Sequence, residues 1–101
     1  MSIKDFKALQ KEARANLKEA KALGKEAKAL GKEGEALGKE GEALHKEGYA
    51  EAADAKLDAS IAKYKASLAK YKEARPLRNK CIAKLKEAEF KIHFPNSMHL
   101  N

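Results

Sequence analysis

The chain contains 101 residues, of which 22 are Lys or Arg and 15 are Asp or Glu, so its formal net charge is +7. A chain of this length forms one domain at most, and because only 6% of its residues are aromatic it can bury a thin seam rather than a globular core. No stretch contains the run of about eighteen apolar residues that a transmembrane helix needs. The first 21 residues contain six basic side chains spread through a predicted helix, which is unlike a secretory signal. We therefore expect a cytoplasmic protein.

Between Ala8 and Ala50 the sequence repeats a seven-residue unit, and its clearest copies, residues 29–35 and 36–42, both read Ala-Leu-Gly-Lys-Glu-Gly-Glu. A strict period of seven predicts a helix that packs against another helix along a fixed seam, with a left-handed supercoil. Leucines occupy one line of the repeat, the d positions, and Ala or Gly occupies the neighbouring a line. The predicted packing seam consists of Leu23, Ala27, Leu30, Gly34, Leu37, Gly41 and Leu44.

All six glycines lie between Gly24 and Gly48. Because each glycine inside a helix costs about 0.5–1 kcal/mol relative to alanine, this segment is a poor helix by itself. Three interpretations are open: a second backbone approaches closely along the small-residue face, the segment becomes helical only on a surface, or the repeat arose by tandem duplication and simply lengthens a rod. The Lys-Glu-Gly triplets that end at Gly34, Gly41 and Gly48 resemble in composition the lipid-binding repeats of the synucleins, which have a longer period. This likeness identifies no family.

Helix start and stop signals divide the chain into two arms of nearly equal length. Ser2 followed by Asp5 matches a capping box and predicts a first helix that begins at Ile3. Gly48 suits the left-handed conformation of a C-cap, after which the seven-residue register breaks. We therefore expect the first arm over about residues 3–47, a turn at about 48–49 and the second arm over about 50–92.

These arms predict an all-α fold, a long antiparallel helical hairpin that is coiled-coil-like and has an Ala/Gly-rich, close-packed seam. Pro76 lacks a backbone N–H and is expected to kink the second helix or make it restart. Residues 1–93 would form a single hairpin domain, and residues 94–101 a C-terminal tail. The alternative is one continuous helix through Gly48 that assembles with other chains.

The second arm carries two apolar faces. A stripe of alanines runs along one side, and a bulky line on the other side predicts the seam of this arm. A helix with two such faces usually contacts two neighbours, of which one chain supplies only one, so we expect a homo-oligomer. The bulky line consists of Leu57, Ile61, Tyr64, Leu68 and Tyr71, and the alanine stripe of Ala55, Ala59, Ala62, Ala66 and Ala69.

Candidate chemistry is sparse. Cys81 continues an apolar line, which favours a buried structural thiol over a nucleophile. The three histidines have no Cys or carboxylate at the spacing of a zinc site. Ser60 and Ser67 lie on a helix flank with no histidine nearby in the sequence. We therefore expect a protein that is not an enzyme and has no metal, cofactor or small-molecule substrate.

Net charge gathers at the two ends of the chain, with +3 over residues 1–21 and +4 over residues 75–101. An antiparallel hairpin brings those ends together into one basic end that can bind anions. We expect an adaptor, regulator or inhibitor that binds an acidic protein surface there. The alternatives are peripheral binding to anionic membranes or nucleic acid through Lys-rich amphipathic helices, or lysines that merely solvate the helices. The candidate binding residues are Lys4, Lys7, Lys11, Arg14, Arg75, Arg78, Lys80, Lys84, Lys86 and Lys91.

Overall fold

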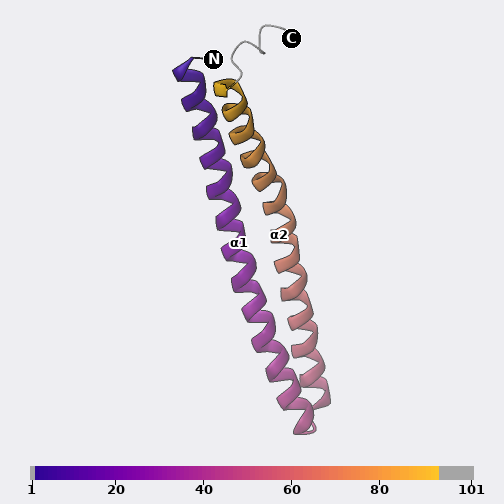
Figure 1. The fold of residues 1–101 in the computed structure, drawn as a ribbon. Helices are drawn as coiled ribbons and strands as arrows, with labels where there is room; N and C mark the ends of the chain where they lie inside the picture. Colours follow the sequence, from indigo (N-terminus) through magenta and orange to yellow (C-terminus); the bar gives the residue numbers. More distant parts are fainter. Residues whose placement is uncertain (1, 94–101) are drawn as a thin grey trace. The chain divides into compact units, whose positions relative to one another are not determined.

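The structure is a computed structural model that describes residues 2–93, with side chains described over residues 2–90. It consists of two helices, α1 (Ile3–Lys46) and α2 (Ala50–His93), joined by a short turn (Figure 1). The predicted all-α helical hairpin is confirmed, and a single continuous helix through Gly48 is excluded. The predicted tail, residues 94–101, lies outside the described residues.

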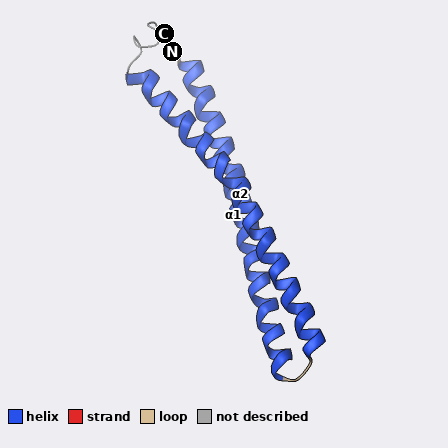
Figure 2. Ribbon diagram, turned by 90° about the vertical axis from the view of Figure 1, so that its right-hand side faces the viewer, coloured by secondary structure: helices blue, strands red, loops and turns tan. Residues whose placement is uncertain are grey.

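The helices contribute to two compact units, each built from both arms. Unit 1 combines residues 1–21 with residues 74–101, and unit 2 consists of residues 22–73 and contains the turn. In Figure 2 the loop between the two helices is the only non-helical segment within unit 2. The expectation of a single domain over residues 1–93 stays a prediction.

Local signals fix both ends of α1. The Ser2 hydroxyl accepts a hydrogen bond from the backbone N–H of Asp5 at 3.1 Å, as an N-cap does. At the other end Gly48 has a φ of +90°, and its N–H bonds to the His45 carbonyl while the N–H of Tyr49 bonds to the Leu44 carbonyl. This pair of bonds is a Schellman motif, which satisfies carbonyls that the helix leaves unpaired. The predicted start and turn are therefore confirmed.

Pro76 lies inside α2, and the helix continues through it. The proline cannot donate a hydrogen bond to the carbonyl of Lys72, so α2 lacks one bond of its ladder here. The predicted restart at Pro76 is wrong, because α2 runs without a break from Ala50 to His93. The kink stays a prediction.

Burial repeats every seven residues along both helices. On α1 the buried line is made only of Ala and Gly, as the repeat predicts. On α2 the buried line is also made of small residues, and no side chain larger than cysteine is buried in the described part of either helix. The two lines are Ala13, Ala20, Ala27, Gly34 and Gly41 on α1, and Ala53, Ser60, Ser67, Ala74, Cys81 and Ala88 on α2.

The predicted seam of the second arm is wrong. The bulky line from Leu57 to Tyr71 is exposed, with 53% of Ile61 and 59% of Leu68 accessible to solvent. The opposite alanine stripe is also exposed, except for the partly covered Ala59. The physical reason is that two helices can approach closely only if both facing lines consist of small residues. The Ala and Gly line of α1 therefore packs against the small residues of α2 and not against its bulky line.

Candidate functional site

The two helices approach each other closely at two glycines of unit 2. A Cβ atom added at Gly34 would lie 3.2 Å from the Ser60 carbonyl oxygen and 3.3 Å from the Tyr64 ring. At Gly41 it would lie 2.9 Å from Leu57 Cγ and 3.3 Å from the Ala53 carbonyl oxygen. Backbone atoms of α2 therefore occupy the space that a side chain of α1 would need. The close packing of the two helices requires glycine at these positions, and it offsets the unfavourable helix propensity of the two glycines.

The predicted packing seam is only partly enclosed. Ala27, Gly34 and Gly41 are buried, whereas the leucines of the d line keep part of their surface in solvent. The d line is therefore at one edge of the interface rather than at its centre. Those leucines are Leu23, Leu30, Leu37 and Leu44.

Two serines of α2 bond to the backbone of α1. The Ser60 hydroxyl donates to the Gly34 carbonyl at 2.6 Å, and the Ser67 hydroxyl donates to the Ala27 carbonyl at 2.7 Å. Both serines are buried, at 6% and 7% exposure. Their placement on a helix flank was a wrong prediction, because they lie at the centre of the seam. A short hydroxyl reaches the facing backbone only at close range, so these bonds specify both the separation and the register of the helices.

A ladder of ion pairs runs along one edge of the seam. In unit 2 each step of seven residues toward the C-terminus of α2 is matched by seven residues backward on α1. The distances between lysine Nζ and glutamate Oε2 lie between 2.9 and 3.2 Å. The pairs are Lys56–Glu40, Lys63–Glu33 and Lys70–Glu26.

Among the described side chains of unit 1 the arrangement recurs once, with Lys84 Nζ at 3.1 Å from Glu12 Oε2. The hydrogen bond that Lys84 donates to Glu12, and then the negative charge of Glu12, raise the pKa of Lys84 above its ordinary value of 10.5. Glu26 raises the pKa of Lys70 in the same way. The charged form of these lysines is therefore stabilised by folding.

The sequence contained a signal for this register that the hydrophobic pattern hid. Acidic residues recur every seven positions on the first arm, and lysines recur every seven positions on the second arm. In an antiparallel hairpin, lysines can lie beside acidic residues along the whole length only in certain registers of the two helices. In such a register the small residue three positions before each lysine faces the seam. The acidic line is Asp5, Glu12, Glu19, Glu26, Glu33, Glu40 and Glu47. The lysine line is Lys56, Lys63, Lys70, Lys84 and Lys91, and Leu77 takes the place of a lysine between Lys70 and Lys84.

All candidate anion-binding residues belong to unit 1. Unit 1 contains twelve Lys or Arg and five Asp or Glu, whereas unit 2 contains ten of each, so the whole net charge of +7 belongs to unit 1. The candidates are exposed, except for Lys84, which is partly covered, and Lys91, whose side chain lies outside the described range.

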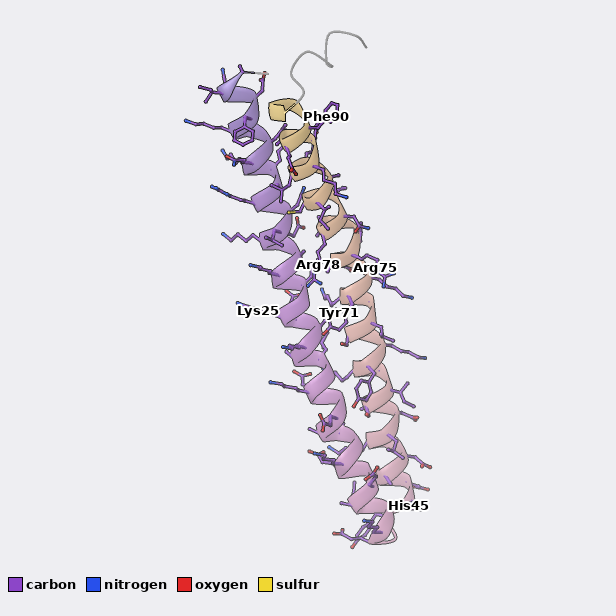
Figure 3. All side chains as sticks on the ribbon, viewed as in Figure 1. Lys25, His45, Tyr71, Arg75, Arg78 and Phe90 are labelled. Atoms are coloured by element: carbon purple, nitrogen blue, oxygen red, sulfur yellow. The ribbon has the colours of Figure 1, made fainter. Side chains whose placement is uncertain are left out.

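The exposed basic side chains of unit 1 come from both helices, and their predicted meeting near the open end of the hairpin stays a prediction. Lys7 and Arg14 each follow a seam position of α1 by one residue, after the partly covered Phe6 and the buried Ala13, and therefore lie at the edge of the seam. Figure 3 labels Arg75 and Arg78 on α2, three residues apart, where they project in different directions. The basic charge of unit 1 is therefore carried by exposed side chains of both helices.

The remaining chemistry is limited. Cys81 is free and buried, as predicted. Among the described residues no group of His, Cys, Asp and Glu could hold a metal ion. Within the same range, neither helix has a stretch that is both long and apolar enough to cross a bilayer. No protein-family model matches the chain, and neither the curated proteins nor the solved structures contain a match.

Proposed function

We propose that the chain acts by binding, as a non-enzymatic, oligomeric adaptor, regulator or inhibitor that attaches to an acidic protein surface or assembly through unit 1. The single observation that carries this proposal is the division of charge. Unit 2 is neutral and unit 1 has the entire net charge of +7 on exposed side chains. A surface of one sign attracts partners of the opposite sign and accelerates their association.

A protein partner fits this surface better than nucleic acid does. Unit 1 contains only Arg14, Arg75 and Arg78 as arginines. Among the side chains of unit 1 that the structure describes, Phe90 is the only exposed aromatic one, which is too few for a set on which bases could stack. The lysines are compact point charges that pair with carboxylates on another protein. Binding to anionic membranes is the competing function.

The test compares two triple variants in a pull-down from the native host. Replacing Arg78, Lys80 and Lys86 by Gln removes three exposed charges of unit 1 while leaving the Lys84–Glu12 pair intact. The matched control replaces Lys25, Lys32 and Lys39, three exposed charges of unit 2, and Figure 3 shows Lys25 pointing away from α2. We expect only the first variant to lose partner recovery and salt dependence.

Equal losses from both variants would contradict a binding role for unit 1. Circular dichroism at low protein concentration, with and without anionic vesicles, separates the competing function. Full helix content without lipid is expected here, whereas helix that forms only with lipid would favour membrane binding.

A further inference from the structure

Unit 2 exposes a stripe of large apolar side chains that its own fold does not cover. The stripe, called the apolar face below, includes Ile61 and Leu68 as its most exposed members. The seam of α2 is already filled by its small residues, so α1 cannot cover this face. A contiguous exposed apolar patch on a small helical unit indicates a surface that another molecule covers. The apolar face consists of Leu57, Ile61, Tyr64, Leu68 and Tyr71.

The apolar face lies on the edge of the seam opposite the ion-pair ladder. Leu57 and Tyr64 approach Gly41 and Gly34 from that edge. A depression near the turn adjoins the apolar face at Leu57 and is lined by residues from both helices. Its lining is Glu42, His45, Lys46, Asp54 and Leu57.

Charges beside the apolar face change sign along the hairpin. On α1, Glu42 and Glu35 lie toward the turn, and Lys28 follows seven residues farther from it. On α2, Asp58 lies toward the turn, and Lys72 lies two heptads farther from it. Both lines are therefore acidic near the turn and basic away from it.

The two lines share one midpoint with the apolar face. The Lys63–Glu33 pair shows which residues of α1 and α2 lie at the same height along the hairpin. At that alignment the midpoint between Lys28 and Glu35 on α1 has the same height as the midpoint between Ile61 and Leu68 on α2. The midpoint between Asp58 and Lys72 falls within one residue of the same level. A surface whose charges invert about the centre of an apolar patch is complementary to itself when turned end over end.

We propose that the apolar face of unit 2 binds the same face of a second copy of this chain, antiparallel, about a two-fold axis at the level of Tyr64 and Lys65. Ile61 of one copy then packs on Leu68 of the other, and Lys28 pairs with Glu35 of the other. Each contact occurs twice, as in any isologous interface.

A parallel arrangement of the two copies is disfavoured by the same residues. It would place Glu42 over Asp54, two like charges, and Lys28 over Leu68. In the antiparallel arrangement only Lys65 meets its own symmetry mate, and it does so at the outer margin of the face, where water and salt screen the repulsion.

The proposal names the interface behind the oligomeric part of the proposed function and is independent of the basic charges of unit 1. Sedimentation velocity of the full chain over a range of concentrations measures the dissociation constant. Ile61→Lys is expected to weaken dimerisation at least tenfold, since it buries a charge at the centre of the interface. Ala62→Lys, at the adjacent exposed position outside the face, is the matched control and should leave the constant unchanged.

Charge reversal tests self-recognition. Glu35→Lys should weaken the dimer, because it places two positive charges opposite each other. The double variant Lys28→Glu, Glu35→Lys should restore the dimer, because a negative charge at position 28 of one copy again faces a positive charge at position 35 of the other. Circular dichroism establishes that all variants keep the helix content of the parent chain. A monomer at every concentration, or a dimer that ignores Ile61→Lys and both reversals, would overturn the proposal, as would a monomer whose apolar face instead binds anionic vesicles.

Orientation is read from a spin label at the exposed position of Glu51, introduced as Glu51→Cys in a Cys81→Ala background. With a rise of about 1.5 Å per residue, the antiparallel dimer places the two labels about 40 Å apart. Labels within about 20 Å of each other would show a parallel dimer and contradict the proposed axis.

Discussion

The two units of this chain share one packing pattern and fill it with different residues. In unit 2 the seam contains Gly34 and Gly41 on α1 and two hydrogen-bonded serines on α2. In unit 1 the corresponding lines contain alanine and one buried cysteine. Unit 2 is electrically neutral, whereas unit 1 carries the excess of basic charge.

This difference shows that one part of the chain, unit 2, fixes the register of the two helices, whereas the other part, unit 1, carries the net charge. Unit 2 has direct bonds from side chains to the facing backbone, which define one alignment of the helices. Unit 1 has Leu77 where a lysine of the ladder would stand, and Pro76 beside it removes a backbone donor. We therefore expect substitutions in the seam of unit 2 to affect stability more than equivalent substitutions in unit 1.

The largest effect is expected when the glycines of closest approach are filled. Gly34→Leu combined with Gly41→Leu forces the helices apart, because backbone carbonyl oxygens of Ser60 and Ala53 occupy the space above them. Overpacking costs about 1–3 kcal/mol per site and exceeds the gain of about 1 kcal/mol in helix propensity. Thermal unfolding followed by circular dichroism should show a lower Tm.

Gly31→Ala is the control for that substitution. A Cβ atom there would lie 3.7 Å from the Ser67 hydroxyl, which is ordinary contact, so the alanine should raise stability by about 0.5–1 kcal/mol. If the double leucine variant instead melts higher than the parent chain, the seam is not close-packed at these glycines.

An intermediate effect is expected from the serines. Ser60→Ala combined with Ser67→Ala removes two bonds to the facing backbone, each with a net contribution of about 0.5–1.5 kcal/mol. Urea denaturation should give a lower midpoint with little change in slope. The matched substitution in unit 1, Cys81→Ala, removes no such bond and should lower the midpoint less. Equal losses would show that the hydroxyls act only as small packing groups.

The smallest effect is expected from the ladder. Because folding raises the pKa of Lys70 above 10.5, its contribution is fully present below pH 10.5 and is lost as the pH rises through the pKa of the folded state. Because the pair is exposed to solvent, this contribution is small. Replacing Lys70 by Gln should therefore lower the urea midpoint at pH 9 and do so less at pH 11.5. The exposed Lys25→Gln is the control, and a deficit that grows with pH would contradict the assigned role of Glu26.

The helices and their turn could be predicted because they depend on local signals. Ser2 and Gly48 make their capping interactions with residues only a few positions away. The small residues of α1 recur every seven positions, so their line is visible in the sequence. The seam of α2 could not be predicted from hydrophobicity, because its largest apolar side chains stay outside. Ser60 and Ser67 occupy the central positions because a close-packed seam requires small side chains, whether or not they are polar. Their hydroxyls donate hydrogen bonds to backbone carbonyls of the other helix.

The candidate site was predictable only in part. The excess of basic charge at both ends of the chain is visible in the sequence, and the hairpin brings those ends into one unit. The distribution of those charges around the unit required the register, and the register depended on the ladder and the serines. The self-complementary charges beside the apolar face likewise emerge only when both helices are aligned.

The central claim is that α2 lies directly on the bare face of α1 within one chain, in the register set by Ser60. A nuclear Overhauser spectrum tests it most directly, through the cross-peak between the Tyr64 ring protons and the α protons of Gly34. Mixing isotope-labelled and unlabelled chains separates contacts within a chain from contacts between chains. We predict a strong intrachain cross-peak at Gly34, consistent with the 3.3 Å approach of the ring to its Cβ position. Its absence, or a cross-peak only between chains, would contradict the account.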